Sequence, residues 1–240
     1  MFYLVGLGLN EKGYSREAYD AIEKCKKIYL ENYTVDFPYD LGYLAKQFKG
    51  KKLIPADREF VEGFTVLEEA GKKDVALLVY GNPLMATTHI SLIEEARKRK
   101  IKFKIVHGAS VLDAVSETGL QIYKFGKITS MPAWIPEKKF APESFIDIVK
   151  ENLSINAHTL ILIDIGLELK KALEQFEISL NNKKIKVGKI LVCQKLGTEK
   201  SKIFYDEISK LKNEKIEIPF CFVIPGKLHF MESEFLENFG

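Results

Sequence analysis

The sequence predicts an α/β protein with two lobes: an N-terminal lobe on a mostly parallel sheet and a C-terminal lobe of mixed α/β structure. Apolar runs alternate with segments of helical periodicity up to about residue 107, which is the pattern of βαβ units. Beyond that point the apolar runs become longer and more frequent, with fewer helices between them. Dividing the 240 residues of the chain by a typical domain length of roughly 150 gives about 1.6, which favours two modest domains. The expected boundaries are residues 1–107 and 108–240.

The N-terminal lobe is expected to begin with a buried strand. The apolar run Phe2–Gly8 has no basic region before it, so it predicts a first strand and not a signal peptide. The helix expected at 88–100 would bury Ile90, Ile93 and Ala96, which share one face at helical spacing. The other elements expected in this lobe are a helix capped by Ser15, a strand at 28–30, a helix at 41–48, and strands at 75–80 and 103–106.

The C-terminal lobe is expected to be richer in strands. Its expected elements are strands at 159–165, 189–195 and 218–224 and helices at 144–152 and 167–180. The segment 131–136 is expected to be irregular, because its prolines break helices and strands alike. An acidic amphipathic helix that docks on the lobe then ends the chain. Its acidic and apolar faces are Glu232, Glu234 and Glu237 against Phe235, Leu236 and Phe239.

Composition and charge exclude several classes of protein. A net charge of +3, from 36 basic and 33 acidic residues, is too balanced for a dedicated nucleic-acid binder. The longest apolar runs hold about six residues, whereas a membrane-spanning helix needs roughly 20. Three widely spaced cysteines without a C-x-x-C pair exclude a disulfide framework and a cysteine zinc site. A cytoplasmic protein without a metal site is therefore expected.

Candidate ligand-binding turns follow three of the predicted strands. Open α/β sheets bind ligands at the carboxyl ends of parallel strands. Gly6-Leu-Gly8 follows the first strand, but Glu11 occupies the place of the third glycine of a dinucleotide fingerprint, so this motif alone favours a tight turn without a ligand. The segment 81–89 follows a buried strand, and its nine residues together are more specific. Ser110 and Val111 follow the next strand in the same way.

The histidines do not indicate a catalytic or metal centre. His89 stands at a predicted helix N-terminus, where the charged ring is disfavoured, so it is interpreted as structural rather than as a general base. His107, His158 and His229 lack the spacing of metal ligands, with each other or with a carboxylate. The sequence therefore assigns no catalytic residue.

Taken in order, these motifs resemble those of the diphthine synthases, S-adenosylmethionine-dependent methyltransferases of the tetrapyrrole-methylase fold family. Gly-Leu-Gly-Leu at 6–9 and Gly-x-Pro-x-x-Ala-Thr at 81–87 are shared across the wider methylase family. Tyr-Lys-Phe-Gly-Lys at 123–127 and Pro-Gly-Lys-Leu-His at 225–229 resemble diphthine synthases in particular. The resemblance spans nearly the whole chain, through the segments 6–9, 81–89, 109–115, 118–127, 158–165 and 224–229.

The resemblance implies a two-lobed tetrapyrrole-methylase-like fold that binds S-adenosyl-L-methionine in the cleft between its lobes and works as a homodimer. The implied substrate is translation elongation factor 2, methylated during diphthamide biosynthesis on the amine of an aminocarboxypropyl-modified histidine. No nucleic acid or membrane is an implied partner. The family's cofactor contacts fall on Leu9, Asn82, Met85, Ser110, Val111, Ile163, Leu196 and Phe220, the last two by strand alignment alone.

This reaction needs little special chemistry from the protein. An amine that attacks a sulfonium methyl group makes a direct displacement, which requires a neutral amine and alignment rather than a covalent nucleophile or a metal. Lys124 and Lys127 are expected to steer the protein substrate. Two alternatives stay open: a methyltransferase of the same fold that acts on a corrinoid or on ribosomal RNA, and a nucleotide-binding regulatory protein without catalysis. The near-neutral charge disfavours RNA, and the motif at 123–127 favours the diphthine synthases.

Asn82 departs from the family pattern, which usually has aspartate in a Gly-Asp-Pro turn. Asparagine keeps the shape but loses the charge that could attract the sulfonium or the amino group of the cofactor. At a separation of about 4 Å that attraction is roughly 1 kcal/mol in water and about 4 kcal/mol at intermediate dielectric. Asn82 is therefore expected to bind the cofactor through its amide, and Asn82→Asp is expected to tighten binding.

Overall fold

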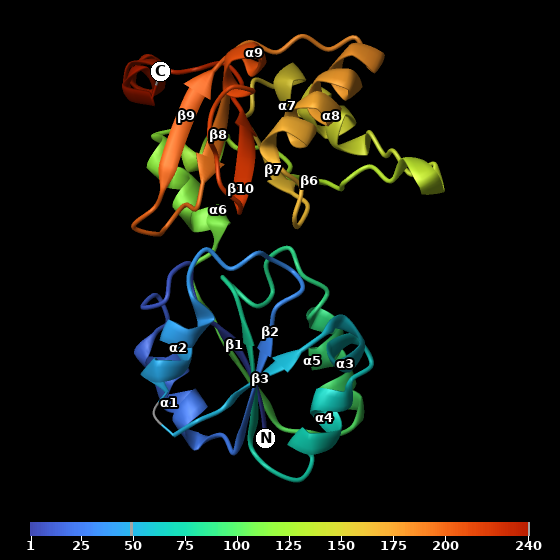
Figure 1. Cartoon of the computed structure of the whole chain (residues 1–240), viewed down its shortest axis with the longest axis vertical. Helices are drawn as coiled ribbons and strands as arrows, with labels where there is room; N and C mark the ends of the chain where they lie inside the picture. The colour runs from blue at the N-terminus through green and yellow to red at the C-terminus, as the bar shows by residue number, and fades with distance from the viewer. Residues whose placement is uncertain (49, 240) are drawn as a thin grey trace. The chain divides into compact units, whose positions relative to one another are not determined.

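The computed structural model describes residues 1–48 and 50–239 and divides the chain into two units, residues 1–114 and 115–240 (Figure 1). The sequence placed the boundary at 107/108, whereas the structure places it between Ala114 and Val115. The later boundary has a physical reason, because residues after the last strand of the first unit bond back to that unit. The side chain of Asn82, for example, donates to the Gly108 carbonyl oxygen at 3.2 Å.

The first unit is built on a five-stranded parallel sheet in the order β3-β2-β4-β1-β5. Its strands are β1 (Phe2–Gly6), β2 (Lys27–Glu31), β3 (Leu53–Ala56), β4 (Val75–Val79) and β5 (Phe103–Val106). β1 and β4 are buried along their whole length. Strands buried on both faces read as continuous apolar runs, which is why the sequence identified these central strands.

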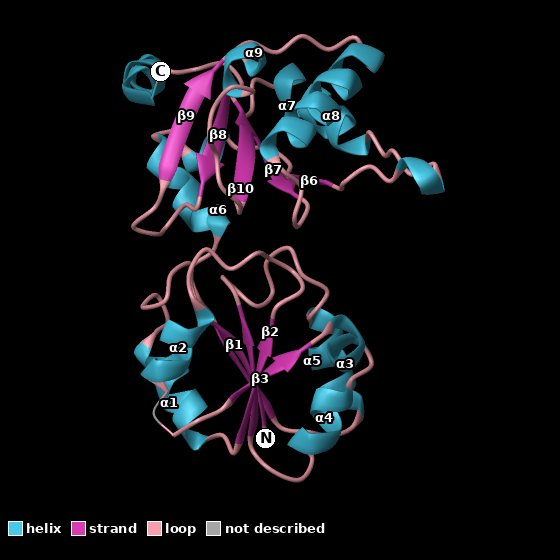
Figure 2. Cartoon of the chain, viewed as in Figure 1, coloured by secondary structure: helices cyan, strands magenta, loops and turns pink. Residues whose placement is uncertain are grey.

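Helices cover both faces of this sheet. Figure 2 shows α1 (Arg16–Lys24) and α2 (Leu41–Gln47) on one face and α3 (Arg58–Glu62), α4 (Thr65–Ala70) and α5 (Ile90–Lys98) on the other. Successive residues of each strand enter opposite cores: Phe2 and Leu4 pack on the side of α3–α5, Tyr3 and Val5 on the side of α1 and α2. Ser15 caps α1 as predicted, since its side chain accepts from the Ala18 N–H at 3.0 Å. A short helix, α6 (Val111–Ala114), ends the unit.

The expected buried face of α5 is partly wrong. Ile93 and Ala96 are buried as predicted, and Leu92 joins them, but Ile90 is 62% exposed. The helix begins at Ile90 rather than at residue 88, so Ile90 lies in the first turn, where the chain has not yet reached the core. β3, α3 and α4 were not predicted.

The second unit contains a mixed sheet in the order β6-β7-β10-β8-β9. Its strands are β6 (Thr129–Met131), β7 (Thr159–Ile163), β8 (Ile190–Gln194), β9 (Lys202–Asp206) and β10 (Phe220–Ile224). β6 runs parallel to β7, and the other pairs are antiparallel. The segment expected to be irregular therefore begins inside a short strand, β6, and β9 was not predicted.

The helices α7 (Ser144–Ser154) and α8 (Leu169–Asn182) pack on one face of this sheet around Phe145, Phe176 and Phe222 (Figure 2). The remaining elements are α9 (Ile208–Leu211), α10 (Phe230–Leu236) and the 3₁₀ turns η1 (Val115–Thr118), η2 (Ile122–Lys124), η3 (Pro136–Lys138) and η4 (Glu237–Phe239). The predicted class, a parallel α/β lobe followed by a mixed α/β lobe, is confirmed.

Candidate functional site

Five of the eight predicted cofactor positions lie at one edge of the first unit. β4, β1 and β5 are adjacent parallel strands, so their carboxyl ends share an edge of the sheet. The loops that leave these ends carry Leu9, Asn82, Met85, Ser110 and Val111. The topology therefore brings together residues that are up to about a hundred positions apart in the sequence.

Glycines allow these three loops to pack directly on one another. Gly8 and Gly81 form a bridge in which each N–H donates to the other's carbonyl oxygen, at 3.2 and 3.0 Å. A Cβ on Gly6 would lie 2.6 Å from the Gly81 oxygen and 2.7 Å from the Gly108 nitrogen. Gly8 has a φ of +71°, and a Cβ there would lie 2.6 Å from the Gly13 oxygen. Close backbone packing thus explains these glycines without a ligand.

The amide of Asn82 ties two of the loops together. Its Nδ2 donates to the Gly108 carbonyl oxygen at 3.2 Å and lies 3.2 Å from Nδ1 of His107, while its Oδ1 accepts from the Leu84 N–H at 3.2 Å. An aspartate here would turn a carboxylate oxygen toward the Gly108 carbonyl. Asn82 therefore holds the two loops together, a role that the sequence-based expectation about its missing charge did not include.

The other predicted residues of this edge differ in how available their side chains are. Ser110 is buried, and both its N–H and its hydroxyl donate to Oδ2 of Asp113, at 2.7 and 3.0 Å. Val111 is half-buried at the start of α6, and Leu9 is buried. Met85 is 47% exposed. Met85 is thus the predicted contact whose side chain is most open to a ligand.

Next to Leu9 lies an aromatic cluster of Phe37, Tyr39 and Tyr80 that the sequence did not predict. The rings of Phe37 and Tyr39 lie 5.4 and 6.3 Å from that of Tyr80, and the Tyr80 hydroxyl donates to the Leu9 carbonyl oxygen at 3.0 Å. Burial raises the pKa of the Tyr80 hydroxyl. The Tyr39 hydroxyl is buried and has no partner among the described residues. The signal that could have found this cluster is Phe-Pro-Tyr at 37–39, in the loop after β2.

His89 is buried, as a structural residue would be, and its Nδ1 lies 3.1 Å from the Pro83 carbonyl oxygen. Because that oxygen can only accept, Nδ1 carries the proton, and Nε2 has no partner among the described residues. The Thr87 hydroxyl donates to the same oxygen at 2.8 Å. These contacts fold the segment 83–89 into a rigid turn before α5.

The other three predicted positions lie at one edge of the second unit. Ile163 ends β7, Phe220 begins β10, and the register pairs Leu162 with Cys221, which sets Ile163 level with Phe220. Leu196 follows β8, and the backbone of Lys195 donates to the Pro219 carbonyl oxygen at 2.9 Å. Leu196 and Phe220 are buried and Ile163 is half-buried.

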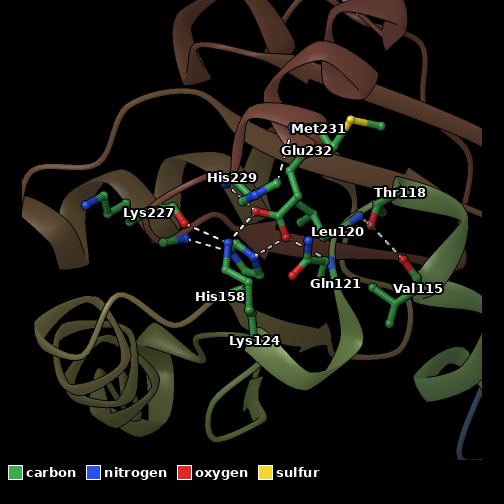
Figure 3. Close-up of polar contacts among 11 residues, drawn as sticks. Val115, Thr118, Leu120, Gln121, Lys124, His158, Lys227, His229, Met231 and Glu232 are labelled. Carbon is green, nitrogen blue, oxygen red and sulfur yellow. Dashed lines mark hydrogen bonds and ion pairs between the residues drawn. The ribbon is translucent and has the colours of Figure 1, made fainter.

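The second unit also contains a buried carboxylate, Glu232, which Figure 3 shows among its partners. Its Oε1 accepts from the Gln121 N–H at 2.9 Å and from Nε2 of His158 at 3.2 Å. Its Oε2 accepts from the His229 N–H at 2.7 Å and from Nζ of Lys124. We call Glu232 and these four donors the Glu232 hub. The sequence placed Glu232 with Glu234 and Glu237 on the acidic face of the terminal helix, but the side chain of Glu232 is buried, at 1% exposure.

The hub sets the protonation of its members. Burial pushes the pKa of Glu232 up, but hydrogen bonds from His229, Lys124, Gln121 and His158 outweigh it and hold this pKa at about 2. Burial is the main reason that the pKa of His158 is lowered. Nδ1 of His158 accepts from the Gly226 N–H at 2.9 Å, so the neutral ring carries its proton on Nε2 and donates it to Glu232.

The lysines expected to steer a substrate are both paired. Lys124 donates to Glu232 and, at 2.8 Å, to the Lys227 carbonyl oxygen. Lys127 is exposed, and its Nζ lies 2.5 Å from Oε1 of Glu151. Lys124 is therefore part of the internal structure of the second unit, with its charge paired to Glu232, and steering of the substrate by either lysine stays a prediction.

Within the described residues, no three His, Cys, Asp or Glu side chains gather in a way that could hold a metal ion. Among the same residues, no helix combines the length and the apolar character that a membrane span requires.

Comparison with known proteins places these sites in a family context. The family described as Tetrapyrrole (Corrin/Porphyrin) Methylases matches residues 1–212. A diphthine synthase of Methanocaldococcus jannaschii is 37% identical over 99% of this chain and 98% of its own length. A diphthine methyl ester synthase of Schizosaccharomyces pombe is 44% identical over 70% of this chain and 59% of its own length. A crystal structure of diphthine synthase superimposes with a TM-score of 0.89, at 30% identity, over 100% of this chain and 95% of the other.

Proposed function

The chain belongs to the tetrapyrrole (corrin/porphyrin) methylases, with a methyltransferase role in diphthamide biosynthesis, and we propose that it methylates the amine of an aminocarboxypropyl-modified histidine of translation elongation factor 2. The methyl donor in this proposal is S-adenosyl-L-methionine. The observation that carries it is the match to diphthine synthases over nearly the full length of the chain, in sequence and in fold. The corrinoid, ribosomal RNA and regulatory alternatives have no comparable support.

The residues at the carboxyl edge of the first unit suit such a donor. Apolar side chains from Leu9, Met85 and Val111 fit the hydrocarbon parts of a nucleoside sulfonium, and Asn82 and Ser110 add polar groups. We propose that these five residues and Ile163, Leu196 and Phe220 hold the donor. When bound, the donor supplies an electrophilic methyl group, and the chain binds and orients the reacting amine.

A methyl-transfer assay tests the proposal. Purified protein is mixed with methyl-labelled S-adenosylmethionine and, in separate reactions, with elongation factor 2 that carries the aminocarboxypropyl group, with the factor that lacks it, with ribosomal RNA and with a corrinoid. Label is expected only on the modified factor. Label on ribosomal RNA or a corrinoid instead, or on no acceptor at all, would contradict the proposal.

Mass spectrometry of the product separates two outcomes within the family. We propose transfer to nitrogen, whereas the name of the Schizosaccharomyces pombe relative describes a methyl ester. An ester methyl is released by mild alkali, whereas N-methyl groups stay attached. Alkali-labile label would assign this chain the ester-forming activity.

We also propose that the chain is a cytoplasmic homodimer. With 16 Phe and 10 Tyr, the chain has more aromatic residues than two small cores require, and aromatic residues are enriched at subunit interfaces. Sedimentation at micromolar concentration is expected to give twice the chain mass of 27.4 kDa, and a particle of the single-chain mass would refute the dimer.

A further inference from the structure

The orientation of the Asn82 amide is fixed by backbone groups on both sides. The Leu84 N–H can only donate, so the atom facing it at 3.2 Å is Oδ1. The Gly108 carbonyl oxygen can only accept, so the atom facing it at 3.2 Å is Nδ2. Neither contact survives a flip of the amide. The side chain of Asn82 is also almost fully buried, at 9% exposure.

This orientation decides the tautomer of His107. Nδ1 of His107 lies 3.2 Å from Nδ2 of Asn82, which has only hydrogens to offer. Nδ1 must therefore accept with its lone pair, and the neutral ring carries its proton on Nε2. The His107 side chain is exposed, directly after β5 and three residues before Ser110. The fold thus presents a histidine N–H donor at the edge that carries five of the predicted donor contacts.

We propose that His107 is a ligand-binding residue of this edge, that its Nε2–H donates to a carboxylate, and that Asn82 is the positioning residue that sets its tautomer. The ligand class rests on the proposed function, in which the methyl donor and the aminocarboxypropyl group each carry a carboxylate and an amine. The protonated amine of the donor has no lone pair to accept the Nε2 proton, and the neutral amine of the substrate uses its lone pair to attack the methyl group. Nε2 itself has no lone pair left to accept a proton from either amine. The carboxylate is therefore the group that fits this nitrogen.

The contact between Nδ2 of Asn82 and Nδ1 of His107 shows what an aspartate at position 82 would change. A carboxylate oxygen in place of Nδ2 could only accept, so Nδ1 of His107 would have to carry a proton. In a neutral ring, Nε2 would then change from a donor to an acceptor. Asparagine or aspartate at position 82 thus decides which kind of ligand atom His107 can bind.

The tautomer is tested by nitrogen-15 spectroscopy of protein labelled at its four histidines. His107→Gln identifies the His107 signals by their loss. The wild-type spectrum is expected to show a protonated Nε2 and an unprotonated Nδ1, and Asn82→Asp is expected to move the proton to Nδ1. A protonated Nδ1 in the wild-type chain would overturn the assignment, and this result does not require that the variant folds or that any ligand binds.

The ligand is tested by calorimetry with S-adenosylmethionine and its decarboxylated analogue, and by the Michaelis constant for modified elongation factor 2. If His107 binds the donor's carboxylate, His107→Ala is expected to weaken S-adenosylmethionine about tenfold or more and to leave the analogue unchanged. If it binds the substrate's carboxylate, donor affinity stays constant and the Michaelis constant rises by a similar factor. His107→Gln, whose amide restores an N–H donor, is expected to recover part of either loss.

Lys102→Ala serves as the matched control, because Lys102 is an exposed residue at the opposite end of β5. If His107→Ala changes neither affinity nor the Michaelis constant relative to this control, the carboxylate proposal is overturned. A wild-type chain that neither binds the donor nor methylates the factor would refute the proposed function and the ligand with it. The nitrogen-15 spectrum would still decide the tautomer in that case.

Discussion

Replacing Glu232 by glutamine is expected to cost the second unit most of the stabilisation that its buried carboxylate provides. The carboxylate accepts four hydrogen bonds, two on each oxygen. Glutamine has one oxygen and one NH₂ group, so in either orientation its NH₂ faces two donors. It meets Gln121 and His158 in one orientation, and Lys124 and His229 in the other.

The magnitude follows from the pKa of this carboxyl, which is held at about 2 against an ordinary value of 4.5. A shift of this size corresponds to about 3 kcal/mol of stability near neutral pH. The sign is set by the direction of the shift. Because the folded pKa is lowered, the contribution is present in full above the unfolded value of 4.5 and is lost as the pH falls from there toward about 2.

Urea unfolding, followed by circular dichroism at a series of pH values between about 7 and about 3, measures this contribution. The difference in unfolding free energy between wild type and Glu232→Gln is expected to be about 3 kcal/mol near pH 7 and to shrink as the carboxylate is protonated. Glu234→Gln, an exposed position on the same helix, serves as the control and should change stability little. A wild-type-to-variant difference that stays constant across this pH range would refute the reasoning.

Three further substitutions or modifications test the packing. Gly126→Ala would place a Cβ 2.2 Å from Oδ1 of Asn152 and should lower the unfolding free energy by roughly 1–3 kcal/mol. Gly188→Ala is the control and should leave stability unchanged, because a Cβ there has no atom within 4 Å. Equal effects of the two substitutions would contradict this account. Gly8→Ala should lower thermal stability as well as ligand affinity, because its positive φ alone costs roughly 1–2 kcal/mol, and an unchanged melting temperature would argue against it. Thiol reagents should not label the native chain, since all three cysteines are buried and burial raises the pKa of Cys25 to about 12; rapid labelling without urea would count against this.

The sequence predicted the central strands and missed three strands at the edges of the two sheets. The missed strands, β3, β6 and β9, each lie at the end of a sheet order. An edge strand needs no continuous apolar run, because it is covered less completely: β9 has no buried residue, and β3 tolerates Pro55. The apolar runs that identify β1 and β4 arise only where both faces are buried.

The sequence predicted at which edge of the sheet the candidate site lies, but not which atoms contact one another there. Strand order follows from βαβ connectivity, so residues after β1, β4 and β5 could be expected to share an edge. The hydrogen bonds of Asn82 could not be expected, because His107 and Gly108 are more than twenty residues away and their atoms must meet to within a hydrogen-bond length. From the sequence, Asn82 in place of aspartate therefore indicates only the loss of a charge. Its effect on the tautomer of His107 follows only from the structure.

Glu232 shows the opposite case, in which the sequence pattern misleads. Alternating acidic and apolar residues in a terminal helix usually indicate a solvated face, yet this glutamate is buried and its partners are up to 111 positions away. The motifs at 123–127 and 225–229 meet here, since Lys124 donates both to Glu232 and to the Lys227 carbonyl. A buried charge is costly unless its lone pairs are satisfied, and here the four donors come from three segments: Gln121 and Lys124, His158, and His229 at the start of the same helix as Glu232. The hub therefore fixes how these segments pack within the second unit, which gives the two motifs a structural reason for their residues that does not depend on ligand contact.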